Sequence, residues 1–282
     1  MIVGVIGAGA MGSGIAQVFA QAEGYEVKLC DISKELASAG KERIGRTLLA
    51  AAARKKLSQE KVEEILNKIT PGLKEEQCLE CDLIIEAALE DLKVKKQTME
   101  ELDVICKPEC IFASNTSSLS ITEIGKGINH PVIGMHFFNP APVMRLVEIV
   151  VGFTTGEDTV EVIKKIVLDI GKKPICAKEA AGFVVNRILV PMINEAVGIY
   201  ADGLATAEDI DDGLKFGANH PMGPLALGDM IGLDIILAVM EVLLRETGDS
   251  KYRPHELLRK MVRAGHLGVK TGKGFYEYYE VG

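Results

Sequence analysis

One histidine and one glutamate in the middle of this chain have the spacing of an acid–base pair. His136 lies near the end of the apolar segment Val132–Phe138, and Glu148 lies within the apolar segment Leu146–Val151. A carboxylate among apolar residues needs a partner, because an unpaired buried charge is costly. Two prolines between the segments favour a turn that brings these residues together, giving a general base oriented by a carboxylate. The same pattern also fits a structural histidine and a solvent-facing glutamate at a sheet edge.

A glycine motif at the start of the chain predicts a dinucleotide site. An apolar strand from Val3 to Ile6 runs into Gly-x-Gly-x-x-Gly, with Gly7, Gly9 and Gly12 as the glycines. The first glycine permits a tight turn, the second lets the backbone approach a pyrophosphate, and the third lets the next helix pack closely on the strand. Amide groups at the start of the helix predicted from Ser13 to Gln21 would face the phosphates, and we expect Ala10 and Met11, within the motif, to contact the cofactor as well. An ordinary glycine-rich strand-to-helix turn is the alternative.

An acidic residue about 20 positions after the glycines completes this fingerprint. Asp31 ends a second apolar strand, Val27–Asp31, where its carboxylate would accept hydrogen bonds from the adenine ribose hydroxyls. A carboxylate repels a 2′-phosphate, and Ile32 and Ser33 follow it instead of an arginine. The motif therefore favours NAD(H) over NADP(H) as cofactor.

Polar residues also follow two further apolar strands. Ser114-Asn115-Thr116-Ser117-Ser118 leaves the strand Ile111–Ser114, and Glu90 and Lys95 follow the strand Leu83–Ala87. Ligands of parallel sheets bind outside the carboxyl ends of the strands. The hydroxyls and the amide could hold a substrate carbonyl, and the charged pair could contact the nicotinamide half of a cofactor. Helix capping and pairing on a helix surface are the alternatives.

A basic cluster stands out because the chain as a whole is acidic. The formal net charge of −8 argues against a general nucleic-acid-binding protein. Arg54-Lys55-Lys56 ends a helical segment and could bind an anionic ligand. A solvated helix end, where cations suit the helix dipole, is the alternative.

Length and composition bound the fold class. A chain of 282 residues can form two domains, and no apolar run is long enough for a membrane span. The first strand begins almost at the N-terminus, which predicts no signal peptide and a cytoplasmic protein. Cys78 and Cys81 form a Cys-x-x-Cys pair without a second pair at zinc-finger spacing. We interpret the six cysteines as free thiols and predict no metal.

The order of elements predicts an α/β domain followed by an all-α domain. Strands alternate with helices up to about Pro174, with a long helical stretch from Lys34 to Ile69, which predicts a Rossmann-type, doubly wound, mostly parallel sheet. Helical periodicity then dominates, including a segment from Leu225 to Arg245. We predict domains at residues 1–184 and 185–282. The apolar helical faces of the second domain predict self-association into a homo-oligomer, with a homodimer as the expected form.

Six motifs in this order resemble the (S)-3-hydroxyacyl-CoA dehydrogenases, and within them the stand-alone bacterial 3-hydroxybutyryl-CoA dehydrogenases. The resemblance covers essentially the whole chain. The motifs are Gly7–Gly12, Ser114–Leu119, Gly134–Pro140, Gly182–Arg187, Pro221–Pro224 and Lys270–Tyr276. Family members usually carry proline where Ala181 stands, a departure that removes no reacting group.

The resemblance implies a role for each matching residue. It implies that His136 is the catalytic base, with Glu148 as its charge partner, and that Ser117 lies near the substrate oxygen and the nicotinamide ribose. Asn186 matches an asparagine that orients the substrate. Positions near the cofactor are matched by Glu90, Lys95 and Asn139, and the basic region that contacts coenzyme A is matched by Arg54, Lys55 and Lys56, with the last two not distinguished.

The expected reaction is the reversible, NAD(H)-dependent interconversion of (S)-3-hydroxybutyryl-CoA and acetoacetyl-CoA. Hydride would move between the cofactor and C3, while His136 exchanges a proton with the oxygen. A dehydrogenase of the same fold acting on a free hydroxy acid or sugar acid is one alternative. A non-catalytic NAD(H)-sensing protein and a flavoprotein are others from different classes.

Overall fold

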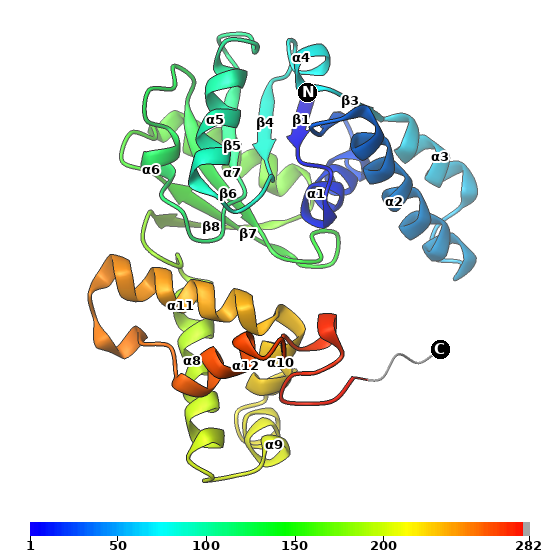
Figure 1. Cartoon of the computed structure of the whole chain (residues 1–282). Helices are drawn as coiled ribbons and strands as arrows, with labels where there is room; N and C mark the ends of the chain where they lie inside the picture. The colour runs from blue at the N-terminus through cyan, green and yellow to red at the C-terminus, as the bar shows by residue number, and fades with distance from the viewer. Residues whose placement is uncertain (279–282) are drawn as a thin grey trace. The chain divides into compact units, whose positions relative to one another are not determined.

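The computed structural model describes residues 1–278, and the chain divides into two compact units, Met1–Ala180 and Ala181–Gly282. The first unit is built on a sheet with helices on both faces, and the second is helical (Figure 1). The predicted fold class is confirmed. The boundary predicted between residues 184 and 185 falls at the start of helix α8 (Val185–Ala201), whereas the units divide after Ala180.

The sheet of the first unit has eight strands in the order β3-β2-β1-β4-β5-β6-β7-β8. Every neighbouring pair is parallel except β6 and β7, which run antiparallel. The strand order reverses direction between β1 and β4, the point where such sheets bind their ligands. The strands are β1 (Ile2–Ile6), β2 (Glu26–Cys30), β3 (Ile69–Gly72), β4 (Leu83–Glu86), β5 (Ile111–Ser114), β6 (Val132–Phe137), β7 (Leu146–Val151) and β8 (Lys173–Lys178).

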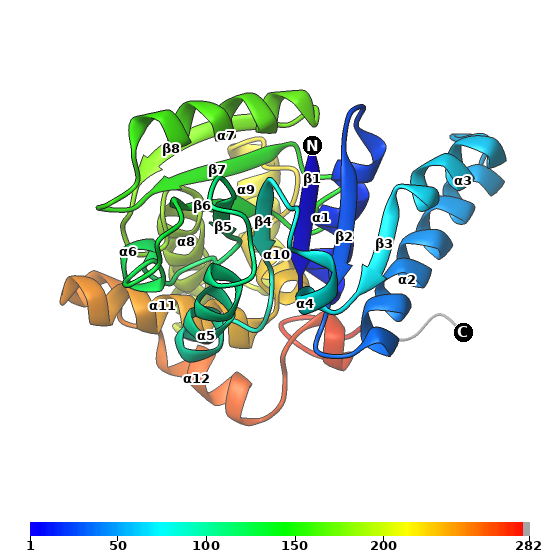
Figure 2. The same cartoon turned by 90° about the horizontal axis from the view of Figure 1, so that it is seen from above.

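Helices cover both faces of this sheet. The main apolar core joins alternate strand residues such as Val3, Val5 and Val27 to helices α1 (Ala10–Gln21), α2 (Lys34–Ala53), α3 (Gln59–Asn67) and α7 (Glu157–Asp169). Helices α4 (Lys74–Gln77), α5 (Leu92–Asp103) and α6 (Ile121–Ile124) complete the first unit. Figure 2 shows β3 at one edge of the sheet, beside α2 and α3, and β8 at the other, beside α7.

The second unit packs its helices around a core of its own. Buried aliphatic residues, among them Ile193, Leu225, Ile236 and Leu243, form one cluster. Its helices are α8, α9 (Ala207–Gly217), α10 (Pro224–Ile231), α11 (Leu233–Thr247) and α12 (Glu256–Arg263). Among the described residues, no helix is both long enough and apolar enough to cross a membrane.

Two strands that the sequence did not predict lie at the two edges of the sheet. β3 contains Pro71 and β8 contains Pro174, and proline lowers strand propensity because it donates no ladder hydrogen bond. Edge strands tolerate proline, since one side of the strand has no partner to bond.

Two predicted helical segments each contain two helices in the structure. In the predicted stretch from Lys34 to Ile69, α2 ends at Ala53, as the sequence predicts for the helical segment before Arg54, and Ser58 caps the start of α3. Lys55 takes a left-handed conformation with φ of 56° between the two helices, and Ile69 begins β3. The predicted helix from Leu225 to Arg245 is likewise two helices. Gly232, with φ of 108°, separates α10 from α11.

Candidate active site

The antiparallel pair β6 and β7 places His136 opposite Glu148. The two residues are direct register partners, and the His136 Nδ1 atom lies 2.7 Å from the Glu148 Oε2 atom. Directly opposed residues of an antiparallel pair have neighbouring side chains, so the strand register itself makes this contact. His136 is 5% exposed and Glu148 is 0% exposed. The contact predicted from the two apolar segments is therefore present, in a buried environment.

The glycine turn after β1 has the geometry that its sequence predicts. Gly7 has a φ of 98°, and its amide donates to the Cys30 carbonyl over 2.8 Å. A Cβ atom at Gly12 would lie 1.7 Å from the Gly7 carbonyl oxygen, so α1 can approach β1 only with glycine at this position. A Cβ atom at Gly9 would meet no atom of the described residues within 4 Å. The backbone at Gly9 is thus open on the side where a ligand would approach.

The first turn of α1 and the end of β2 meet at this glycine turn. Among residues 1–278, no side chain caps α1, which begins after Gly9 with Ala10 and Met11 and has no acidic residue in its first turn. The first amides of a helix have no intrahelical acceptor and carry the positive end of the dipole. Asp31 Oδ2 accepts a 2.6 Å hydrogen bond from the Ala8 amide, which fixes its carboxylate beside the turn. This donor set and open backbone fit a dinucleotide pyrophosphate, with Asp31 in reach of a ribose.

A network of charged and hydroxyl groups lies at the ends of β4 and β5. Asp91 caps α5 by accepting hydrogen bonds from two amides of its first turn, and the helix then directs Lys95 inward. The Lys95 ammonium group lies 2.8 and 3.0 Å from the two carboxylate oxygens of Glu86 and 3.2 Å from Glu90 Oε2. Glu86 and Lys95 are 0% and 1% exposed. The lysine therefore bridges the buried carboxylate of Glu86 and the carboxylate of Glu90, whose side chain is 40% exposed.

Glu90 connects this network to the serine-rich loop after β5. Its Oε1 atom accepts hydrogen bonds from Thr116 Oγ1 over 2.6 Å, from the Ser117 amide over 2.8 Å and from Ser117 Oγ over 3.2 Å. Burial by itself raises the pKa of Glu90, but Lys95 and these donors outweigh that effect and hold the pKa below its usual range. Glu90 is thus an ionised carboxylate that fixes the loop carrying Ser117.

Two asparagines lie beside the histidine strand. The ladder between β5 and β6 ends at the pair Ser114 and Gly134. Beyond it, the Asn115 side chain accepts a 2.8 Å hydrogen bond from the Phe137 amide and so continues the support of β6 next to His136. Asn139 follows β6 and is exposed.

The basic cluster lies at the C-terminal end of α2. Arg54 is the C-cap, and the amides of Lys55 and Lys56 donate to the carbonyls of Ala52 and Ala51. In this pattern of hydrogen bonds, the residue after the C-cap takes a left-handed conformation and is usually glycine. Here that residue is Lys55. All three side chains are exposed, and within residues 1–278 none of them forms an ion pair. The cluster is therefore available to an anion.

Asn186, the remaining predicted site residue, belongs to the second unit. It is half-buried in the first turn of α8. The first unit thus brings together three groups of predicted residues: His136 with Glu148, the glycine turn with Asp31, and Lys95 and Glu90 with Ser117.

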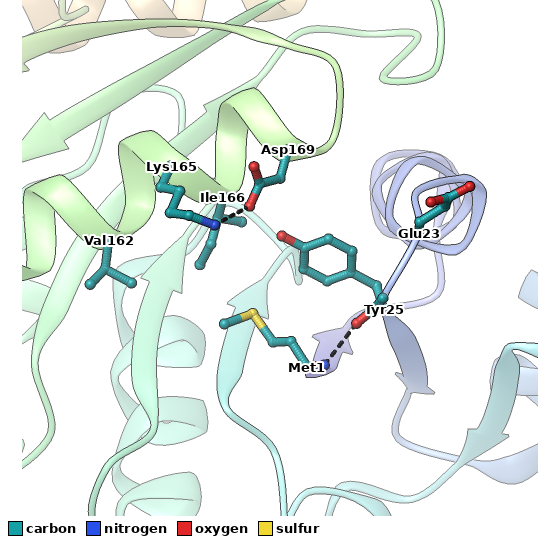
Figure 3. Close-up of a pocket in the computed structure, with 8 residues that line it drawn as sticks. Met1, Glu23, Tyr25, Val162, Lys165, Ile166 and Asp169 are labelled. Carbon is teal, nitrogen blue, oxygen red and sulfur yellow. Dashed lines mark hydrogen bonds and ion pairs between the residues drawn. The ribbon is translucent and has the colours of Figure 1, made fainter.

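Neither the cysteine thiols nor a pocket of the first unit belongs to these three groups of residues. All six cysteines are free thiols, and five are buried, with Cys30 Sγ and Cys78 Sγ 3.8 Å apart. The pocket has a volume of about 640 Å³ and opens where β1 and β2 begin (Figure 3). The glycine turn lies at the opposite end of β1. Its charged groups are mostly engaged locally, as in the 2.8 Å ion pair between Lys165 and Asp169.

Sequence reasoning missed Glu86, which holds Lys95 from the end of β4. A signal was present, because Glu86 ends the apolar segment Leu83-Ile84-Ile85. The argument that singled out Glu148, namely that a carboxylate among apolar strand residues needs a partner, applies to Glu86 as well. Its partner lies nine positions later on a helix, a relation that strand spacing alone does not reveal.

Family models match both units of the chain. The model described as "3-hydroxyacyl-CoA dehydrogenase, NAD binding domain" matches residues 2–180. The model described as "3-hydroxyacyl-CoA dehydrogenase, C-terminal domain" matches residues 182–278. The glycine turn, α1 and Asp31 all lie within the NAD-binding match.

Full-length relatives and a solved structure agree with these matches. The chain is 50% identical over 280 residues to the 3-hydroxybutyryl-CoA dehydrogenase of Clostridioides difficile, covering 99% of both proteins. It is 48% identical to a probable 3-hydroxybutyryl-CoA dehydrogenase of Bacillus subtilis, covering 98% of this chain and 96% of the relative. A crystal structure of (S)-3-hydroxybutyryl-CoA dehydrogenase from Ralstonia eutropha superposes with a TM-score of 0.94 at 45% identity, covering 99% of both chains.

Proposed function

Because the chain belongs to the 3-hydroxyacyl-CoA dehydrogenase family of NAD-dependent oxidoreductases, we propose that it interconverts (S)-3-hydroxybutyryl-CoA and acetoacetyl-CoA. The substrate is inferred from the names of relatives that match over their full length. The single observation that carries the catalytic part of the proposal is the buried 2.7 Å contact between His136 and Glu148.

The glycine turn and Asp31 hold the cofactor in this proposal. Amides at Gly9, Ala10, Met11 and Gly12 bind the pyrophosphate, and Asp31 binds the adenine ribose. Bound NAD(H) supplies the hydride acceptor or donor for C3 of the acyl group. Since the first mononucleotide half lies on the β2 side, the second half lies on the side of β4 and β5. That side carries Lys95, Glu90 and Ser117, with Asn139 after β6, and these residues surround the nicotinamide half.

His136 exchanges the proton. With Nδ1 held by Glu148, the imidazole keeps one orientation, and Nε2 is the atom that gives a proton to the C3 oxygen during reduction and removes it during oxidation. The charge of Glu148 stabilises the imidazolium form that arises when His136 takes the proton. This pair is an acid–base dyad of a kind that suits a reversible dehydrogenase.

The substrate oxygen and the coenzyme A group have separate binding residues. Ser117 Oγ turns from its 3.2 Å hydrogen bond with Glu90 to the C3 oxygen. The role proposed for Asn186 is to orient the substrate. Charge that develops on this oxygen is then stabilised by preorganised donors. The exposed Arg54, Lys55 and Lys56 bind phosphate groups of coenzyme A through charge-assisted hydrogen bonds.

The experiment follows NADH absorbance with acetoacetyl-CoA, beside NADPH and beside free acetoacetate. We expect fast loss only with NADH and the thioester. Fast loss with free acetoacetate would instead support a dehydrogenase of free acids. No loss with any pair, in a protein that still binds NADH, would support a non-catalytic NAD(H)-sensing protein and overturn the proposal.

Assembly and location complete the proposal. The second unit exposes large apolar side chains, including Ile188 (68%), Phe216 (80%) and Leu204 (77%). Exposed apolar side chains favour self-association, so we expect a homo-oligomer formed through the helical unit. The expected location of the protein is the cytoplasm. Light scattering after size-exclusion chromatography measures the mass, and a purely monomeric protein at micromolar concentration would contradict the expectation.

A further inference from the structure

Glu86 is a buried carboxylate that has no direct part in the proposed reaction. It ends β4, where its backbone pairs with Ile6 of β1 and Ser114 of β5. Its Oε1 atom accepts hydrogen bonds from the Ala88 amide over 2.7 Å and from Lys95 over 2.8 Å. Its Oε2 atom accepts from Ser114 Oγ over 2.7 Å and from Lys95 over 3.0 Å. Donors of the protein therefore surround the carboxylate, which is 0% exposed and does not reach a substrate.

The contacts of Glu86 nevertheless lead to the proposed site. Lys95 is shared between Glu86 and Glu90, and Glu90 in turn holds the amide and the hydroxyl of Ser117. A buried ammonium group with a single carboxylate would move fully onto that carboxylate, because attraction is strong where water is excluded. Glu86 supplies the second carboxylate, which leaves Glu90 oriented toward the serine loop.

We infer that Glu86 is a positioning residue that acts through Lys95, anchoring the ammonium group so that Glu90 and Ser117 keep their places at the nicotinamide half of the site. This inference rests on the proposed function, through the role that Ser117 has there. It assigns a purpose to a fully buried ion pair, whose desolvation makes it weak as a source of stability alone.

The network also has a charge that a binding experiment can detect. Glu86, Glu90 and Lys95 together carry one net negative charge. The nicotinamide ring is cationic when oxidised and neutral when reduced, so this charge favours NAD⁺ relative to NADH. The ratio of the two dissociation constants is a readout that loss of stability alone does not change.

Two variants and a matched control separate position, charge and stability. Glu86→Gln removes the charge and keeps the shape. Glu86→Gln combined with Lys95→Met removes the whole buried pair, and the remaining Glu90 restores the net charge of −1. Asp103→Asn is the control, because Asp103 forms a largely buried pair with His130, 2.6 Å apart, at the far end of α5.

We expect Glu86→Gln to lower kcat about tenfold, as a small displacement of reacting groups does, with the KM for acetoacetyl-CoA nearly unchanged. The ratio of the dissociation constant of NAD⁺ to that of NADH, measured by NADH fluorescence and calorimetry, rises roughly threefold. In the double variant, the ratio of dissociation constants and the melting temperature return to their wild-type values, while kcat stays low. Asp103→Asn lowers the melting temperature and leaves kcat and the ratio unchanged.

Three results would overturn the inference: recovery of kcat together with melting temperature in the double variant, an unchanged affinity ratio in Glu86→Gln, or an equal loss of kcat in Asp103→Asn. If Glu86→Gln fails to fold, Glu86→Asp replaces it: the shorter side chain keeps the charge but draws the carboxylate away from Lys95, so kcat falls while the affinity ratio is unchanged, and a wild-type kcat would overturn the inference. Failure of the proposed function is distinguishable, because it appears as an inactive wild-type enzyme, whereas the affinity ratio requires no turnover.

Discussion

The first unit buries the carboxylates of Glu86 and Glu148 beside a lysine and a histidine, whereas the second buries those of Asp211 and Asp229 beside backbone amides and tyrosine hydroxyls. All four are at most 4% exposed. The burial is therefore equal, and the partners differ. The histidine partner can exchange a proton near neutral pH and the lysine partner carries a charge, whereas the amide and tyrosine donors of the second unit fix the chain.

The two buried aspartates of the second unit hold the segment 275–278 through hydrogen bonds. Asp229 accepts hydrogen bonds from the amides of Phe275 and Tyr276 and from the Tyr278 hydroxyl, each over 3.0 Å. A Cβ atom at Gly274 would lie 2.0 Å from Asp229 Oδ1, so the segment can lie against the carboxylate only with glycine there. Burial raises the pKa of Asp229, more than these donors lower it. Its role is architectural.

The largest effect is expected at His136, and it tests the chemical side of the comparison. His136→Gln keeps a polar side chain on β6 but removes the group that exchanges the proton. We expect kcat for acetoacetyl-CoA reduction to fall about 10²–10⁴-fold, with NADH affinity retained. Steady-state kinetics and NADH fluorescence measure both. Near-normal turnover would show that His136 is structural.

Asp229→Asn tests the architectural side. The amide group of asparagine places a donor against backbone amides that also donate. We therefore expect the free energy of unfolding to fall by about 2–3 kcal/mol. The kcat of the folded fraction stays within twofold of the wild type. Denaturant titration followed by kinetics checks this, and a large loss of kcat in fully folded protein would break the comparison.

The basic cluster extends the comparison to exposed charges. Replacing Arg54, Lys55 and Lys56 with alanine should raise the KM for acetoacetyl-CoA about tenfold, because charge-assisted contacts to phosphate are lost. NADH affinity and melting temperature stay unchanged. The pair Lys164→Ala and Lys165→Ala on α7 serves as the control. If both variants raise KM equally, the effect is one of overall charge.

The smallest effect is expected for a substitution at Lys55, which should raise the stability of the protein and weaken the binding of the thioester. Glycine suits the left-handed conformation that Lys55 adopts, so Lys55→Gly should stabilise the protein by about 1 kcal/mol. The KM for the thioester rises roughly twofold, since one cation is lost. A melting curve and a KM determination suffice. A variant that is less stable would show that the lysine is kept for structure.

The parts of the site that follow from local spacing could be predicted from the sequence. The glycine turn needs specific residues within six positions, and the register of two neighbouring strands brings His136 to Glu148. The roles assigned to these residues stay predictions. The contact of Glu86 with Lys95 depends on how α5 lies on β4, and sequence periodicity carries no information about that placement.

The fold was predictable where the pattern is strong and failed where proline or glycine interrupts it. Central strands contain continuous apolar runs such as Leu83-Ile84-Ile85, which identify buried parallel strands. The edge strands Ile69–Gly72 and Lys173–Lys178 carry proline and polar residues, so pairing in the folded sheet rather than propensity makes them strands. The break at Gly232 arises from a positive φ, which helical periodicity does not show.

The most direct test of the central claim compares Glu148→Gln with Asp229→Asn, each measured as kcat per folded enzyme. Both changes remove one buried negative charge and keep the side-chain size. The account predicts a fall of about 10²-fold for Glu148→Gln, because the imidazole loses its orienting carboxylate, and less than a twofold change for Asp229→Asn. Equal losses, or full activity of Glu148→Gln, would contradict it.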